Sequence, residues 1–136
     1  MPKILGLNIV AVIVASVAFF MVGWLWYGVL FVDAYMESTG MSADEAGGAF
    51  DIWMAGGFLI TLMQVIGLGL VMKWKGEASP AAAATTAVVL WVFLALPFTM
   101  YPYLYTPAHD SAMLMIDASH LLVGWVVSAV VLCLIK

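Results

Sequence analysis

Four long stretches of this chain carry almost no charge, and each is long enough to cross a lipid bilayer. A membrane-spanning helix needs about 20 mainly apolar residues, because the hydrocarbon core is about 30 Å thick. A soluble domain usually has about 25% charged residues, whereas this chain has 9% charged and 66% hydrophobic residues. The sequence therefore predicts an all-α membrane protein with a single transmembrane domain over residues 1–136. Its four-transmembrane-helix bundle is expected to use the stretches 4–32, 52–72, 81–104 and 107–135.

Residues at the ends of these stretches are typical of helix boundaries. Ser79-Pro80 has the form of an N-cap followed by proline at the first helical position, which starts the third helix. Thr106-Pro107 repeats this pattern and predicts the start of the fourth helix. Pro97 lies inside the third stretch, so the outer end of that helix is expected to be kinked or unwound. Ser42 and Glu45 form a capping box, which predicts a short amphipathic helix in the first outer loop.

The four lysines indicate how the helices are oriented. With four spans, Lys3, Lys73, Lys75 and Lys136 all fall on one side of the membrane. Cytoplasmic loops carry an excess of lysine and arginine, so this side, with both termini, is predicted to be cytoplasmic. The opposite side is predicted to be acidic and to hold Asp33, Glu37, Asp44, Glu45, Asp51 and Asp110.

The charge balance and the motif content exclude several partners and reactions. The net charge is −4 and the chain has no arginine, so it lacks the basic surface that nucleic acid requires. The sequence contains no catalytic triad ordering, P-loop or glycine-rich nucleotide motif, and nothing in it favours an enzyme. No cofactor or metal site is predicted. The expected partners are the lipid bilayer and either further copies of the chain or another membrane protein.

Asp117 and His120 stand out because ionisable groups inside a membrane are costly and often functional. Their i, i+3 spacing places them on one face of the fourth helix, close enough for the carboxylate to reach the imidazole. Three interpretations are open. The pair can fix this helix against its neighbours, or form a proton- or ligand-responsive site, since histidine titrates near neutral pH. It can also belong to a metal or redox-cofactor site of the di-iron type, although that would need carboxylates from the facing helices.

Small and polar residues surround this pair in the predicted bundle. On the fourth helix, the residues expected at the outer mouth and at helix–helix contacts are His109, Asp110, Gly124 and Ser128. On the second helix, one face carries Gly57, Thr61, Gln64 and Gly67. This face predicts close packing with a cross-helix hydrogen bond, or a set of partners for the Asp117–His120 pair. Trp91 and Trp125 lie near mid-span, where an indole N–H needs an acceptor, so both are expected to face the interior or a neighbouring subunit.

Aromatic residues cluster at the outer end of the first helix, at Trp24, Trp26, Tyr27 and Tyr35. They are typical of an interfacial aromatic belt, or they line an outward-facing pocket. Residues 23–31 read Gly-Trp-Leu-Trp-Tyr-Gly-Val-Leu-Phe, and Gly40 follows. With Asn8 at the start of this helix, the series resembles the hallmark of a bacterial membrane family catalogued as domain of unknown function 1761.

Two departures from that family concern the site. Tyr35 stands where the family usually has tryptophan. Residues 116–120 are similar to the Ile-Asn-Ala-Gly-Tyr-like opening of its last helix, but Asp117 and His120 replace neutral polar residues there. The resemblance implies a multi-pass protein of the bacterial inner membrane with no assigned activity. Any proton-linked role would then be specific to this chain.

Three functional hypotheses follow from these residues. The first is a small transporter or channel-like oligomer that binds or moves a proton or small solute at Asp117 and His120, with Gln64 and Thr61 facing them. The second is a non-catalytic accessory or scaffold subunit of a membrane complex. A third, weaker one is a membrane-embedded enzyme or cofactor-binding protein.

Overall fold

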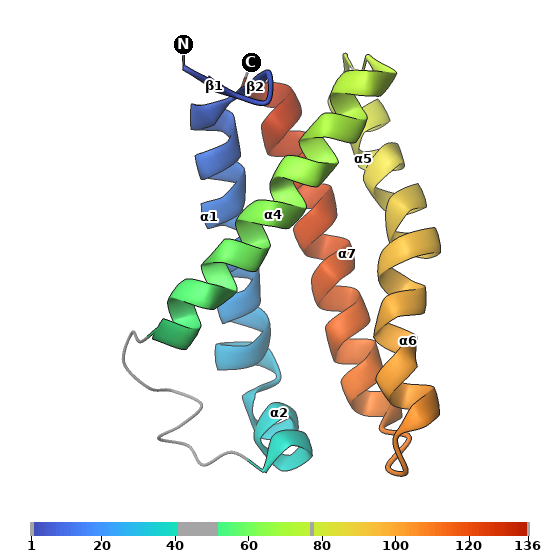
Figure 1. The fold of residues 1–136 in the computed structure, drawn as a ribbon. Helices are drawn as coiled ribbons and strands as arrows, with labels where there is room; N and C mark the ends of the chain where they lie inside the picture. The colour runs from blue at the N-terminus through green and yellow to red at the C-terminus, as the bar shows by residue number, and fades with distance from the viewer. Residues whose placement is uncertain (1, 41–51, 77, 136) are drawn as a thin grey trace.

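The computed structural model describes residues 2–40, 52–76 and 78–135, and it forms a bundle of long helices (Figure 1). Four of these helices are long and apolar enough to cross a membrane, over Ile9–Leu30, Met54–Lys75, Pro80–Tyr105 and Ser111–Leu134. The predicted four-helix membrane bundle is thus confirmed. In chain order, the elements of the first half are β1 (Lys3–Ile4), β2 (Leu7–Asn8), α1 (Ile9–Leu25), η1 (Trp26–Leu30), α2 (Val32–Thr39) and α4 (Ile52–Lys75). The second half has α5 (Pro80–Leu90), η2 (Trp91–Ala95), α6 (Leu96–Tyr105) and α7 (Ser111–Leu134), where η marks a π-helical segment.

The first helix begins later than expected, at Ile9, because a small hairpin precedes it. Strands β1 and β2 pair antiparallel through a two-residue turn at Leu5 and Gly6, both with positive φ. Such a turn matches the twist of a hairpin. Asn8 then caps α1, since its side-chain oxygen accepts a hydrogen bond from the Val10 amide at 2.9 Å.

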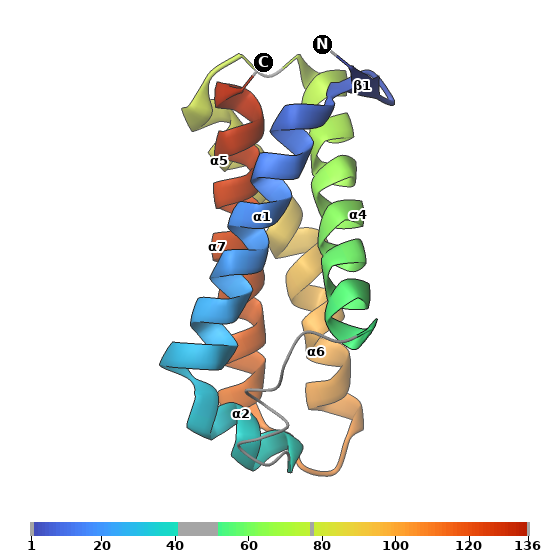
Figure 2. The ribbon, with the colours of Figure 1, turned by 90° about the vertical axis from the view of Figure 1, so that its left-hand side faces the viewer.

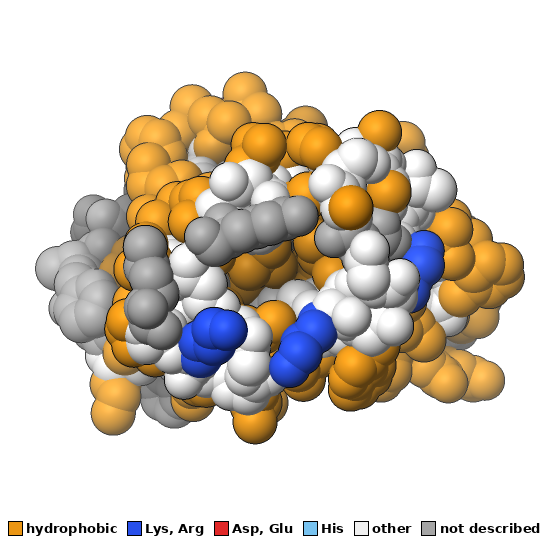
Figure 3. Space-filling view, turned by 90° about the horizontal axis from the view of Figure 1, so that it is seen from above, with side chains coloured by type: hydrophobic (Ala, Val, Ile, Leu, Met, Phe, Trp, Pro, Cys, Tyr) orange, Lys and Arg blue, Asp and Glu red, His pale blue; other side chains and the backbone are white. Residues whose placement is uncertain are grey.

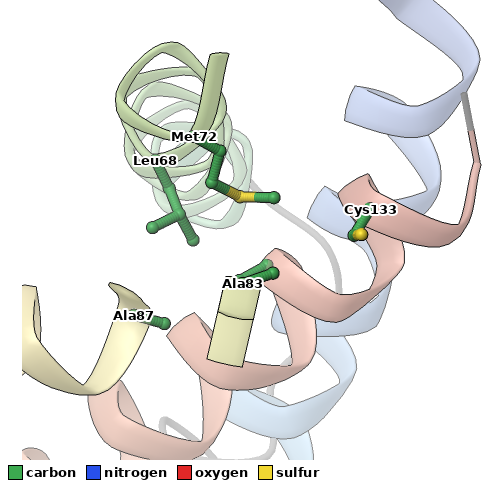
Figure 4. Packing of buried hydrophobic residues seen from close by; sticks show 6 residues of the cluster. Leu68, Met72, Ala83, Ala87 and Cys133 are labelled. Carbon is green, nitrogen blue, oxygen red and sulfur yellow. The ribbon is translucent and has the colours of Figure 1, made fainter. Parts of the chain in front are cut away.

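Helix α7 lies at the centre of the bundle and packs along both α1 and α5. Helix α4 crosses α1 and also contacts α7, but it diverges from the α5–α6 rod (Figures 1 and 2). Two clusters of buried side chains hold the helices together. One joins α1 to α4 through Val12, Ala15, Phe19 and Val65. The other joins α4, α5 and α7 through Leu68, Met72, Ala83, Ala87, Ala129 and Cys133 (Figure 4).

The third span stays helical through Pro97, where a kink or unwinding was expected. Proline has no N–H, and in an α-helix its ring clashes with the carbonyl four residues earlier. The π-helical segment η2 ends at Ala95, two residues before this proline, and its wider turn bonds the Leu96 amide to the carbonyl of Trp91. The helix therefore absorbs the proline with a local change of pitch.

The connections confirm one predicted helix start and correct another. Ser79 caps α5, accepting a hydrogen bond from the Ala82 amide at 3.1 Å, with Pro80 in the first turn. The expected start of the fourth helix at Thr106-Pro107 is wrong, because Thr106 ends α6 and α7 begins at Ser111. Asp110 is its N-cap, and a carboxylate next to free backbone amides is a stronger cap than the Thr106 hydroxyl. The predicted capping box at Ser42 and Glu45 lies outside the described residues.

The two ends of the bundle differ in charge. We call the end with both chain termini the lysine end, since Lys3 and Lys73 lie there (Figure 1). Figure 3 views this end and shows lysine side chains, with no acidic one among its described residues. The opposite end, which carries α2 and the α6–α7 connection, is the acidic end and includes Asp33, Glu37 and Asp110.

Candidate functional site

The candidate site forms where α1 and η1 pack antiparallel against α7. Phe19, Gly23 and Tyr27 repeat every four residues and share one face of the first span. Phe19 lies over Gly124, where a side-chain carbon would overlap its ring. One turn further, a side-chain carbon on Gly23 would sit 3.2 Å from the His120 Nε2 atom, so glycine provides the space that the imidazole occupies.

His120 lies between aromatic rings of the first span. Its ring centroid is 5.5 Å from that of Phe19 and 5.1 Å from that of Tyr27, the latter in an edge-on arrangement. Among the described residues, His120 makes no hydrogen bond or ion pair. The carboxylate of Asp117 therefore does not bond the His120 imidazole as expected, although both side chains contact Tyr27 at the same helix interface.

Asp117 instead accepts a hydrogen bond from the hydroxyl of Tyr27. The carboxylate is half-buried, and the phenol that reaches it comes from a residue 90 positions earlier in the chain. The Tyr27 ring also lies 5.1 Å from the ring of Tyr35 on α2. This contact links the only carboxylate within the described spans to the aromatic cluster of the first span.

The two residues that follow Asp117 also accept hydrogen bonds from other spans. The Trp26 indole N–H donates to the Ser119 hydroxyl at 2.9 Å, and the Trp91 indole N–H donates to the Ala118 carbonyl at 2.8 Å. Trp26 and Trp91 are the first residues of η1 and η2. Both π-helical segments therefore begin at residues that bond this one turn of α7. Such segments are rare and frequent at functional sites.

A cavity of about 230 Å³ at the acidic end reaches this turn of α7. We call it the acidic cavity, because Asp110 and Asp117 both line it. Its other polar lining residues come from α2, α6 and the connection after α6, and they are Ser38, Thr99, Tyr103 and Thr106. Among the described residues, none that lines this cavity is a lysine or an arginine. The polar part of the lining thus consists of carboxylates and hydroxyls, beside the apolar residues Pro102, Ala108, Met113 and Leu114.

Asp110 holds the mouth of the acidic cavity in place. One carboxylate oxygen accepts a hydrogen bond from the Met113 amide at 3.0 Å, and the other accepts from the Ser38 hydroxyl at 2.6 Å. These bonds, first that from Ser38, lower the pKa of Asp110 below its ordinary value of 3.8. His109 lies beside it with a positive φ of 42° and is exposed. Its Nδ1 atom lies 2.7 Å from the carbonyl oxygen of Tyr103.

The polar residues predicted on the second helix lie elsewhere. The Thr61 hydroxyl donates to the Gly57 carbonyl of its own helix at 3.0 Å. The Gln64 side-chain oxygen accepts from the Trp125 indole N–H at 2.8 Å, and its amide nitrogen donates to the Ile60 carbonyl. The described residues give neither side chain a hydrogen bond to Asp117 or His120. Gln64 satisfies a mid-span indole, as the position of Trp125 required.

The small residues differ in what they contact. Gly124 and Ser128 are buried, and Ser128 bonds the Gly124 carbonyl at 2.7 Å. A side-chain carbon on Gly57 would lie 3.9 Å from the ring of Phe20, an ordinary contact. One on Gly67 would meet nothing within 4 Å among the described residues. Gly67 therefore does not mediate close packing between the described helices of a single copy.

The aromatic cluster of the first span divides between the exterior and the site. Trp24 is 56% exposed, as a residue of an interfacial belt would be. Trp26 and Tyr27 instead turn inward and donate hydrogen bonds to Ser119 and Asp117 of α7. Sequence reasoning did not identify Ser119 or Trp91 as parts of the site. The distance of each residue from the acidic end of its span could have identified them, because residues the same number of helical turns from that end lie at the same depth in the bundle.

The described residues contain no group of three His, Cys, Asp or Glu side chains that could hold a metal ion. No curated protein and no solved structure matches the chain. A family model described as "Protein of unknown function (DUF1761)" matches residues 10–133, which include all four spans almost completely. The chain therefore belongs to this family, as its first helix indicated.

Proposed function

We propose that this protein binds a proton or a small cation at Asp117, entering from the acidic end, as a step in transport. The observation that carries the proposal is the acidic cavity, which connects a carboxylate at the helix end, Asp110, with one inside the span, Asp117. Asp117 lies six residues into α7, about 9 Å along the helix. A carboxylate at this depth is costly and is typical of ion and proton pathways.

The charges and ligands of the acidic cavity favour a positively charged occupant. Two carboxylates line it, and hydroxyls from Ser38, Thr99 and Thr106 supply further oxygen atoms. Carboxylate and hydroxyl oxygens suit small hard cations and hydrated protons. The titratable groups around Asp117 are Tyr27, which bonds it, and Asp110 and Tyr103, which line the same cavity. The rings of His120 and Tyr35 pack on that of Tyr27.

The bond from Tyr27 couples occupancy of Asp117 to the packing of the first span. A hydrogen bond to an ionised carboxylate is about twice as strong as one between neutral groups. A proton or cation at Asp117 neutralises the carboxylate and so weakens its bond with Tyr27. The contact between η1 and α7 is thereby loosened when the site is filled, which is the coupling a transport step needs.

Proteoliposomes containing the purified protein and a trapped pH indicator test this proposal. We expect an imposed pH or cation gradient to give a flux that Asp117→Asn abolishes. Asp33→Asn is the matched control, because Asp33 is an exposed acid at the same end that does not line the acidic cavity. Separate gradients of H⁺, Na⁺ and ammonium identify the occupant. If Asp117→Asn carries the same flux as Asp33→Asn for every ion, the proposal is wrong.

A second candidate function is that of a subunit in an oligomer, and the observation that favours it is a groove between α4 and the segments α5 and η2. The groove has a volume of about 300 Å³ and is lined by Gly67, Leu90, Leu94 and Trp125, among others. Small residues at an open helix face let a second helix approach closely. We infer that a second copy of the chain fits here. Gly67→Leu should then shift the protein from oligomer to monomer in analytical ultracentrifugation, and a monomeric wild type would contradict it.

We further propose that the lysine end faces the cytoplasm of a bacterial cell, with the protein in the inner membrane. The positive-inside rule supports this orientation, because lysines near the ends of spans set the topology. Single cysteines introduced in turn at Lys3 and Ser111, in a Cys133→Ser background, should differ in labelling by a membrane-impermeant maleimide. Labelling in intact cells only at position 111 is the expected result, and labelling only at position 3 would reverse the orientation.

A further inference from the structure

A second cavity, at the lysine end, has a different chemistry from the acidic cavity. It has a volume of about 420 Å³, and we call it the lysine cavity because Lys3 and Lys73 both line it. Its walls include the apolar side chains of Leu7, Met72 and Leu132. The cavity therefore combines two lysines, which we call its rim, with an apolar wall.

The two lysines on the rim are not neutralised by acids within it. The Lys73 ammonium has one long contact, 3.5 Å from the carbonyl oxygen of Leu5 in the hairpin turn. Lys3 lies on β1 and is exposed. None of the residues that line the cavity in the described parts of the chain is acidic. The lining therefore carries two positive charges and is able to attract an anion.

Asn8 adds a hydrogen-bond donor to the same cavity. Its side-chain oxygen is used as the cap of α1. Its Nδ2 atom is buried and has no hydrogen-bond partner among the described residues. A buried donor without an acceptor is unfavourable, because it has lost its bonds to water and gained none in the protein. An occupant with acceptor oxygens would relieve that cost.

We propose that the lysine cavity binds the phosphate of an anionic membrane lipid, with an acyl chain against its apolar wall. The shared chemistry of the rim is phosphate recognition by two ammonium groups, which a free phosphate would also satisfy. The apolar wall and the position at the end of four spans favour the lipid. Basic pockets between transmembrane helices bind anionic headgroups in this way. This inference does not rest on the acidic cavity or on Asp117.

Native mass spectrometry of the purified full-length protein in detergent tests the proposal. The probes are phosphatidylglycerol, phosphatidylcholine and inorganic phosphate, added separately and in competition. We expect the wild type to retain phosphatidylglycerol in preference to phosphatidylcholine. The K3Q/K73Q double variant should bind it about 30-fold more weakly, which corresponds to about fivefold for each lysine near a membrane surface. Lys75→Gln removes the same charge from the same end but outside the cavity lining, so its affinity should match the wild type.

Asn8→Asp gives an independent variant that retains the cap oxygen of α1. It removes the N–H donor and adds a negative charge at the cavity, so it should also weaken phosphatidylglycerol binding, with helix content by circular dichroism unchanged. Equal retention of the two lipids by the wild type would overturn the proposal, as would wild-type affinity in both K3Q/K73Q and Asn8→Asp. Full displacement of the lipid by millimolar inorganic phosphate would overturn the assignment to a lipid.

Discussion

The bond from the Tyr27 hydroxyl to Asp117 can be removed without disturbing the packing around it. Tyr27→Phe deletes one oxygen atom and retains the ring, whose centroid lies 5.1 Å from those of His120 and Tyr35. Hydrogen bonds to charged groups contribute about 1.5–3 kcal/mol in soluble proteins. Bonds between membrane helices average about 0.6 kcal/mol, with a maximum of about 1.7. Because this acceptor is a half-buried carboxylate, we expect Tyr27→Phe to lower the free energy of unfolding by about 1.5 kcal/mol.

The assay is reversible unfolding in mixed micelles with increasing sodium dodecyl sulfate, followed by circular dichroism. Tyr105→Phe is the matched control, because Tyr105 is 78% exposed and the loss of its hydroxyl should change stability by less than about 0.5 kcal/mol. In a double-mutant cycle, Tyr27→Phe and Asp117→Ala should show a coupling energy of about 1 kcal/mol. The reasoning is refuted if Tyr27→Phe matches the control, or if the two changes are additive.

Two further predictions concern the interface and the mouth of the acidic cavity. Gly124→Ala should lower the free energy of unfolding by about 1–3 kcal/mol, because the added carbon overlaps the Phe19 ring. Gly56→Ala is the control, since a carbon there meets no described residue within 4 Å, and it should not lower the free energy of unfolding in the same assay. Asp110 has a pKa below its ordinary value of 3.8, so its contribution to stability is present above that value and is lost as the pH falls through its folded-state pKa. Asp110→Asn retains a good N-cap but should flatten this acid-side loss when unfolding is measured from about pH 2 to 5. An unchanged pH profile would contradict the assignment.

The sequence was sufficient for the number of spans and for the helix starts that depend on local chemistry. Ser79-Pro80 starts α5 as predicted, because an N-cap and a following proline act within one turn. Thr106-Pro107 has the same form and failed, since Asp110 lies three residues further on and supplies a charged cap. Where two possible N-caps lie within a few residues of each other, the sequence alone does not determine which of them starts the helix.

The partners of the site residues could not be predicted, because they depend on the register of one helix against another. The i, i+3 spacing correctly placed Asp117 and His120 on one face, but the face they meet is that of the first span. Gln64 and Thr61 have suitable chemistry and lie on a different interface. A periodic pattern identifies which residues of a helix point inward, whereas the rotation and height of the facing helix decide what each of them meets.

Two spans depart from regular α-helix at the same level, beside one turn of α7. Each π-helical segment begins at a tryptophan, Trp26 or Trp91, whose indole N–H bonds α7 next to Asp117. An indole inside a membrane must find an acceptor, and the acceptors available here lie on one turn of α7. An unpaired N–H in hydrocarbon costs several kcal/mol. The two tryptophans at the start of the π-helical segments satisfy their donors on the same turn of α7 that presents Asp117 to the acidic cavity.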